Sequence, residues 1–150
     1  MQLIFITCAE STALDARRNS ISLFHVLEEL AVTNLPAVVP QMCVALIFTR
    51  EADEPAEPDN VEMRITLNDR ELYRGPVEVR FGQHLRFRAL HDLRGMVINA
   101  PGQLKFAVLM NQQDLGSWFI VINHIGQPVV QTQLPLSDDH TANAPETGRR

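Results

Sequence analysis

The sequence feature that most constrains the fold is a strict alternation of apolar and polar residues over residues 61–68. In Val61-Glu62-Met63-Arg64-Ile65-Thr66-Leu67-Asn68 every odd position is apolar and every even position is polar. Successive side chains of a β-strand point to opposite faces, so this segment predicts a strand with one buried face. Similar alternation returns in residues 77–81 and 85–90, after the turn-forming residues of segments 68–70 and 75–76. Short alternating strands between turns favour an antiparallel sheet.

Further strands are expected in apolar runs that are rich in β-branched and aromatic residues and are bounded by Pro or Gly. These runs are residues 2–8, 42–49, 95–99, 104–111 and 117–123. Residues 111–114, Asn-Gln-Gln-Asp, predict a hairpin loop, and residues 71–74 a short return strand. The total of about eight or nine strands predicts an all-β fold, an antiparallel two-sheet β-sandwich of the immunoglobulin-like or Greek-key type.

Residues 20–35 fit two interpretations. Ile21, Leu23 and Val26 suit a strand, whereas Ile21, Phe24, Leu27, Leu30 and Ala31 also suit the apolar stripe of a helix. Asn19 or Ser20 would then cap the helix at its amino terminus. We expect a strand over residues 20–27, and residues 28–35 remain open as a helical turn.

The length and composition predict a single domain. A chain of 150 residues of which 45% are hydrophobic can build a core without disulfides, because a domain of this size removes roughly 70% of its unfolded surface from water. We place this domain at residues 1–126. After Gly126 the alternation weakens and then ends, so residues 127–150 are expected to form a tail that is first extended and then disordered.

The net charge of −5 is unevenly distributed, because residues 51–60 hold five acidic residues and no basic one. The remaining body is nearly neutral, which argues against a nucleic-acid-binding protein that neutralises phosphates. No segment approaches the ~20 apolar residues of a membrane helix, and the sequence shows no signal-peptide pattern. We therefore expect a cytoplasmic protein with no membrane partner, in which Cys8 and Cys43 are buried thiols.

Motifs with well-understood chemistry are absent from the sequence. It contains no Gly-rich phosphate loop, no Gly-x-Ser-x-Gly, no Cys-x-x-Cys and no His-Glu-x-x-His. We therefore predict no cofactor and no catalytic residue, and we favour a non-enzymatic role. The alternative is an enzyme that uses the region of His84, His91 and Asp92. A zinc site would need three or four converging ligands, and these residues lie at the ends of one expected strand.

The acidic residues Asp53, Glu54, Glu57 and Asp59 could supply oxygen ligands to calcium. The turn pattern of a calcium-binding loop is missing, so a solvated connection between strands is the favoured interpretation.

Four arginines occupy polar positions of the alternating segments: Arg64, Arg80, Arg86 and Arg88. Adjacent strands would place them on one outer sheet face together with Glu62 and Glu78. Pairing between these charges is the simpler interpretation. If unpaired, the arginines would form an anion-binding patch suited to carboxylate or phosphate groups.

Four strands are apolar at both alternating positions, including residues 44–48, 106–110 and 118–122. A sandwich strand needs apolar side chains on one face only, so something must cover the second face. The candidates are residues 28–40 and 127–136 of the same chain, or another subunit. We predict a non-catalytic structural or protein-interaction module. Its partner is expected to be a second copy of the same chain or another protein. Its expected outer-face contacts are Ile47, Leu109, Trp118, Ile120 and Ile122.

The order of these segments also resembles a known family. The opening residues 2–10, the strand from Asn19 to Phe24, the turn over residues 35–40 and the hairpin over residues 101–121 resemble an uncharacterised family of small bacterial proteins. The resemblance covers residues 2–123. It implies a β-sandwich and assigns no catalytic residue.

Overall fold

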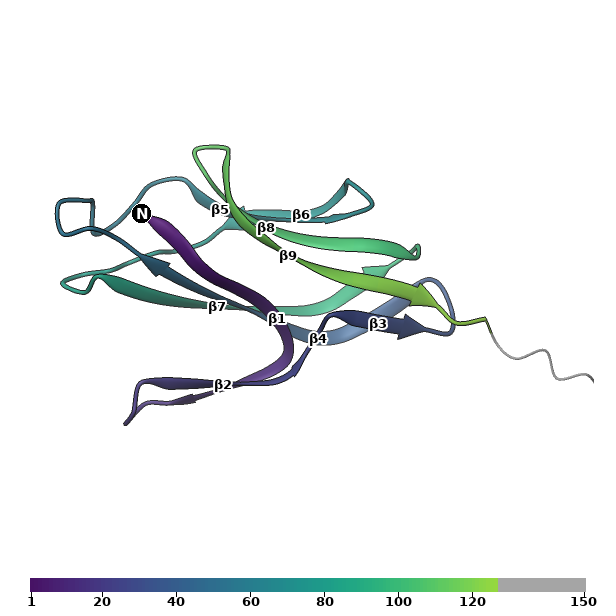
Figure 1. The fold of residues 1–150 in the computed structure, drawn as a ribbon. Coiled ribbons are helices and arrows are strands. Elements are labelled where there is room, and N and C mark those ends of the chain that lie inside the picture. The colour runs from purple at the N-terminus through teal and green to yellow at the C-terminus, as the bar shows by residue number, and fades with distance from the viewer. Residues whose placement is uncertain (127–150) are drawn as a thin grey trace, which may run out of the picture.

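The fold was obtained as a computed structural model that describes residues 1–126. These residues form nine strands (Figure 1). The strands are β1 (Gln2–Asp15), β2 (Ser20–Val26), β3 (Glu29–Val32), β4 (Ala37–Thr49), β5 (Val61–Leu67), β6 (Arg70–Pro76), β7 (Arg86–Ile98), β8 (Gly102–Met110) and β9 (Gln113–His124). Within this part of the chain no helix is long and apolar enough to cross a membrane.

The strands form two sheets that pack face to face (Figure 1). Sheet A has the order β2-β1-β4-β7, and sheet B has the order β3-β9-β8-β5-β6. Every pairing is antiparallel except that of β3 with β9, which is parallel. The prediction of an all-β two-sheet sandwich is confirmed. The predicted tail, residues 127–150, lies outside the described residues.

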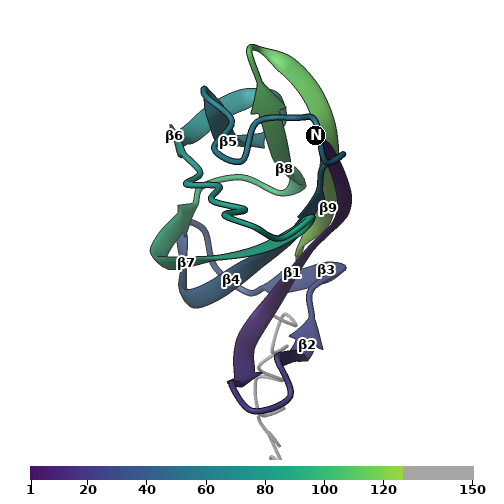
Figure 2. The same cartoon turned by 90° about the vertical axis from the view of Figure 1, so that its left-hand side faces the viewer.

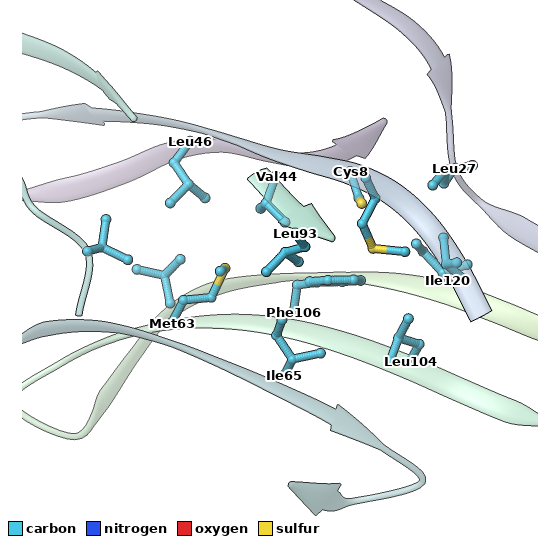
Figure 3. Close-up of a cluster of buried hydrophobic side chains, with 14 of the residues drawn as sticks. Cys8, Leu27, Val44, Leu46, Met63, Ile65, Leu93, Leu104, Phe106 and Ile120 are labelled. Carbon is cyan, nitrogen blue, oxygen red and sulfur yellow. The ribbon is translucent and has the colours of Figure 1, made fainter. Parts of the chain in front are cut away.

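The core fills the space between the two sheets. The alternating segment of residues 61–67 forms β5, and its odd positions are buried, with Met63 and Ile65 fully inaccessible to solvent. Figure 3 shows Val44 and Leu46 of sheet A facing Met63 and Phe106 of sheet B. Burial of apolar surface stabilises the fold by about 25 cal/mol per Å², so these positions carry much of the folding free energy.

Two hairpins turn where the sequence predicts. Asn68 and Asp69 between β5 and β6 have φ values of 49° and 65°, and Asn111 and Gln112 between β8 and β9 have values of 51° and 69°. Two consecutive residues with positive φ characterise the type I′ turn, whose twist matches that of antiparallel strands. The loop predicted at residues 111–114 is shorter than expected and consists of Asn111 and Gln112.

The possibility of a helical turn at residues 28–35, which the sequence left open, is not realised, whereas the strand expected at residues 20–27 is confirmed as β2. Residues 29–32 form β3, which adds to the edge of β9. The Val121 amide donates to the Glu28 carbonyl over 2.9 Å, and the Ile125 amide donates to the Val32 carbonyl over 2.8 Å. The free edge of β9 satisfies the backbone groups of this segment, so they do not need a helix.

Two further expectations about strands need correction. Residues 77–81 form no strand, although Val77, Val79 and Phe81 are buried at alternate positions. This segment is held by single backbone bonds, from the Val77 amide to the Val61 carbonyl and from the Phe81 amide to the Ala56 carbonyl. The strands expected at residues 85–90 and 95–99 are parts of one continuous strand, β7 (Arg86–Ile98), because Gly95 adopts a φ of 65° without ending the pairing with β4.

Candidate functional site

The first strand takes part in two different pairings. Residues 2–9 of β1 pair with β4, and residues 9–15 pair with β2. Beyond Ala9 the chain folds back, so that the β1–β2 hairpin lies beneath the outer face of sheet A (Figures 1 and 2). Leu14 of the hairpin therefore lines the same cavity as Ile47 of β4, although Ile47 pairs with Phe5 in the first half of β1. We call residues 10–26 the arm.

The bend of the arm has a local cause. The pairing of β1 with β2 is interrupted between Ala9–Val26 and Ser11–Phe24, where His25 has a φ of 53°. A non-glycine residue rarely adopts this conformation, which breaks the extended course of a strand. His25 Nδ1 lies 2.7 Å from Glu10 Oε2, so the two residues at the bend also contact each other through their side chains.

The arm is tied to sheet A at both ends. Arg88 Nη2 on β7 donates a 3.0 Å hydrogen bond to the carbonyl of Asn19 at the tip of the arm. Nearer the bend, Thr12 of the arm and Asp92 of β7 lie beside the Cys43 thiol on β4. Burial raises the pKa of Cys43; the neighbouring Thr12 hydroxyl lowers this pKa, and the Asp92 carboxylate raises it further. The arm therefore forms part of the cover over the outer face of sheet A.

The edge strands of the two sheets differ in how they are protected. Sheet edges present unpaired backbone groups, and proteins shield them with charges, proline or short length. Four strands lie at the ends of the two sheet orders, and three of them follow this rule: β7 carries Arg86, Arg88 and Arg94, β6 carries Arg74 and Pro76, and β3 is 4 residues long. The fourth of these terminal strands, β2, has 7 residues, Ser-Ile-Ser-Leu-Phe-His-Val, with no Arg, Lys, Asp, Glu, Pro or Gly. The edge of β2 is therefore open to another strand.

Apolar side chains accompany this open edge. Phe24 and Val26 of β2 are 49% and 45% exposed. β2 pairs with β1 alone in the described structure, and it lies on the side of the arm away from β7 (Figure 2). Exposed apolar side chains beside unpaired backbone groups are the features of a protein-binding strand.

Three of the five predicted outer-face contacts are wrong. Leu109, Ile120 and Ile122 are 4%, 1% and 2% exposed, and the last two belong to the core between the sheets. The outward positions of β9 are instead Phe119 and Val121, because the strand has the opposite orientation to the one expected.

The other two predicted contacts are partly buried. Trp118 packs against the core and donates a 2.9 Å hydrogen bond from Nε1 to the Leu27 carbonyl. Ile47 lies on the outer face of sheet A, where it lines the cavity beneath the arm.

The predicted single arginine face does not form. Arg64 lies on β5 in sheet B, Arg86 and Arg88 lie on β7 in sheet A, and Arg80 lies outside any strand. Arg80 pairs with Glu78 at 3.3 Å, but both residues belong to one segment outside the strands, so this is not the expected pairing across adjacent strands. Only Arg86 and Arg88 share a surface, and they line the cavity beneath the arm.

The region of His84, His91 and Asp92 is not brought together. His84 lies in the exposed loop before β7. His91 and Asp92 are consecutive in a strand and point to opposite faces. His91 faces Tyr73 of β6, with Nε2 3.4 Å from the tyrosine hydroxyl, whereas Asp92 lies beside Cys43 of β4. Burial lowers the pKa of His91. Within residues 1–126 no three metal-ligating side chains converge.

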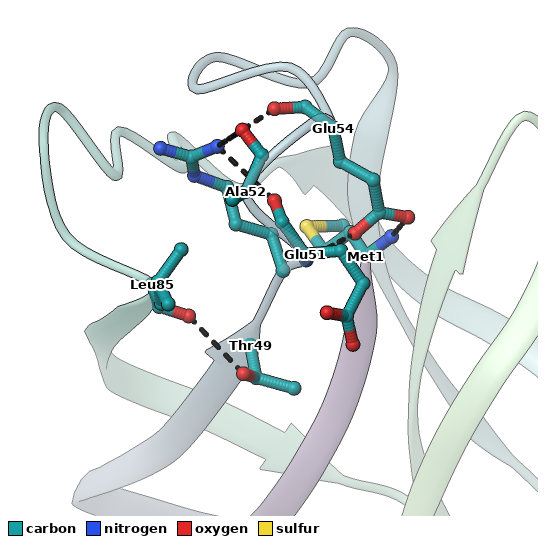
Figure 4. Close-up of polar contacts among 7 residues, drawn as sticks. Met1, Thr49, Glu51, Ala52, Glu54 and Leu85 are labelled. Atoms are coloured by element: carbon teal, nitrogen blue, oxygen red, sulfur yellow. Dashed lines mark hydrogen bonds and ion pairs between the residues drawn. The ribbon is translucent and has the colours of Figure 1, made fainter.

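The acidic segment, residues 51–60, does not gather its carboxylates around one point. It is held by contacts with Met1 and Arg50. The Glu54 carboxylate pairs with the amino-terminal ammonium group of Met1 (Figure 4). Arg50 Nη1 donates to the carbonyls of Glu51, Ala52 and Glu54, the last at 2.7 Å. These contacts tie the segment to the start of β1.

The arm was not predicted from the sequence. Residues 9–15 have no strict alternation, and nothing in the pattern shows that a strand changes partner halfway. One signal was available: β2 has the apolar composition of a buried strand but follows a turn rich in arginine. The two cysteines are buried and unpaired, as predicted.

No protein-family model matches this chain, and a comparison with curated proteins finds none that is significantly similar.

Proposed function

We propose that this protein is a non-catalytic protein-interaction module that self-associates through β2. The observation that carries the proposal is the contrast among the four terminal strands of the two sheets. Three of them carry charge or proline or are short, and among these four β2 alone is long, uncharged apart from His25, and flanked by exposed Phe24 and Val26. An open edge of this kind accepts a further strand by backbone hydrogen bonding.

A second copy of the same strand is a suitable partner. Two β2 strands related by a two-fold axis run antiparallel, and each meets the same surface of the other. Because β2 contains no Lys, Arg, Asp or Glu, like charges do not oppose each other across the new pair. Phe24 of each copy then gains an apolar neighbour. The pairing extends sheet A across the dimer.

The surface area that the two β2 strands bury against each other determines the affinity that we expect. Stable protein interfaces bury about 1,200–2,000 Å² in total. A pair of strands with 7 residues each, together with the two flanking side chains, lies at or below the lower end of this range. We therefore expect association in the micromolar range. The buried, unpaired Cys8 and Cys43 support a cytoplasmic location for the module, where reducing conditions keep thiols free.

Sedimentation velocity of the full chain between about 5 and 200 μM tests the proposal, because this range brackets a micromolar dissociation constant. The wild-type chain should shift from monomer to dimer as its concentration rises. Phe24→Lys places a charge beside the edge in both copies and should remain monomeric. The matched control is Val38→Lys, a change at a side chain that is 62% exposed on β4 and outside β2.

The control should dimerise like the wild-type chain. A wild-type chain that is monomeric throughout the range contradicts the proposal. So does a Phe24→Lys variant that dimerises as strongly as Val38→Lys.

A further inference from the structure

A cavity of about 500 Å³ lies between the arm and the outer face of sheet A. Segments far apart in the sequence form its walls: Leu14 and Asn19 of the arm, Ile47 of β4, and Arg86, Arg88 and Leu90 of β7. The open edge of β2 is a separate surface, so this cavity is independent of the proposed self-association.

The arginines of the cavity are available to a ligand. Within the described part of the chain, Arg18, Arg74 and Arg80 are paired with carboxylates, and Arg50 is bound to backbone carbonyls. Arg86 and Arg88 form no ion pair with any described residue. Among residues 1–126 they are the only charged side chains that line the cavity. Within this part of the chain, no anion balances the two guanidinium groups.

The Arg88 side chain is held in place by one hydrogen bond, but one of its buried donors has no acceptor among the described residues. Its Nη2 donates to Asn19, which fixes the side chain against the arm. Its Nε is buried and has no hydrogen-bond partner among the described residues. Buried polar groups in folded proteins are almost always hydrogen-bonded. An acceptor oxygen in the cavity would satisfy this group.

The rest of the described wall is apolar except for Asn19, and its apolar residues are Leu14, Ile47, Phe87 and Leu90. Leu14 and Leu90 are 57% and 38% exposed, and Ile47 lies between β1 and β7 on the same face. Pockets that bind small molecules combine a mostly apolar wall with a few polar groups that fix orientation. This cavity has both components, and its polar groups are cationic.

We propose that this cavity binds a small amphipathic carboxylate, with the carboxylate on the guanidinium groups of Arg86 and Arg88 and a compact hydrocarbon body against Leu14, Ile47 and Leu90. Guanidinium groups match carboxylates geometrically, because two parallel N–H groups meet two oxygens. Asn19 is the one uncharged polar residue among the described residues of the wall, and it offers no second charge, so the ligand carries one charged end.

Isothermal titration calorimetry with octanoate tests this assignment, and octanol serves as a neutral ligand with the same chain. Octanoate should bind one site per chain with a dissociation constant below about 1 mM, and octanol should bind at least about tenfold more weakly. Arg86→Gln removes a charge from an exposed side chain that does not hold the arm, and it should weaken octanoate binding about tenfold or more. Arg86→Lys should restore part of this loss.

Arg80→Gln is the matched control, because Arg80 is an exposed arginine outside the cavity, and it should leave octanoate binding unchanged. Phe24→Lys should also bind octanoate normally, which separates this site from the β2 edge. Three results overturn the proposal: no octanoate binding, equal binding of octanol and octanoate, or equal affinities in Arg86→Gln and Arg80→Gln.

Discussion

Arg88 on β7 donates a 3.0 Å hydrogen bond from its Nη2 to the carbonyl of Asn19 at the tip of the arm, across 69 residues of sequence. This contact fixes the tip of a hairpin whose other attachments lie near its base. Asn19 itself adopts a φ of 49°, a conformation that asparagine tolerates better than most residues. The contact determines how the arm covers sheet A and how β2 is presented.

The first prediction concerns the reactivity of the two cysteines. Cys43 lies beneath the arm, whereas Cys8 lies in the core between the sheets. Burial raises the pKa of both thiols, that of Cys8 to about 12, so both should react slowly with iodoacetamide, which attacks the thiolate. Arg88→Ala removes a hydrogen bond from a charged group, worth about 1.5–3 kcal/mol at most. It should speed alkylation of Cys43 about tenfold through opening of the arm.

Mass spectrometry of the separate cysteine peptides gives both rates in one experiment, and Cys8 serves as the internal control. Its rate should not change. Equal acceleration of Cys8 and Cys43 would mean that the substitution loosens the whole domain, and the arm would then not be the unit that opens.

The second prediction is a dependence of stability on pH through His91. Burial lowers the pKa of this histidine below its ordinary value of 6.5. The unfolded chain therefore takes up a proton at a higher pH than the folded chain, and the free energy of unfolding should fall as the pH drops below 6.5. Chemical denaturation of His91→Gln should show a weaker fall over the same window. His84→Gln, a change in an exposed loop, should retain the full wild-type fall. An unchanged pH dependence in His91→Gln would contradict this prediction.

The third prediction is a dependence of stability on pH through Glu54. Here the charged form of the side chain, the carboxylate, is the one that stabilises the fold. Its pKa lies below the ordinary value of 4.5, first because the amino-terminal ammonium donates to its carboxylate. The stabilisation from this contact is present above pH 4.5 and should be lost as the pH falls toward the lowered pKa. Glu54→Gln should be less stable than wild type at pH 6, and the difference should shrink under acidic conditions. Glu57→Gln in the same exposed segment should show no such difference. If both variants behave alike, the contact with Met1 contributes nothing.

The sequence predicted the strands best where one face is buried and the other is solvated. In β5, Met63 and Ile65 alternate with Glu62 and Arg64, and both the strand and its inward face are correct. In β9 the residues from Trp118 to Ile122 are all apolar, so the pattern contained no information about which side faces the core. The exposed pair turned out to be Phe119 and Val121.

Other features depend on topology, which the pattern does not contain. Val77, Val79 and Phe81 are buried at alternate positions although they lie in no strand. Every second side chain of this connection between β6 and β7 points into the core, as it would in a strand. Arg86 and Arg88 were correctly placed on an outer face. Their separation from Arg64 follows from the assignment of β7 and β5 to different sheets. The arm required knowledge of where β1 changes its partner.

Amide hydrogen exchange measured at two protein concentrations tests whether β2 is the surface through which two copies of this chain pair. Exchange resolved by peptide should be compared at about 2 and 200 μM, on either side of a micromolar dissociation constant. If β2 pairs between copies, protection of Ser20–Val26 should rise at the higher concentration, while the edge strands Glu29–Val32 and Arg70–Pro76 should exchange at the same rate at both concentrations. Protection that rises at another edge, or β2 amides that exchange equally fast at both concentrations, would contradict it.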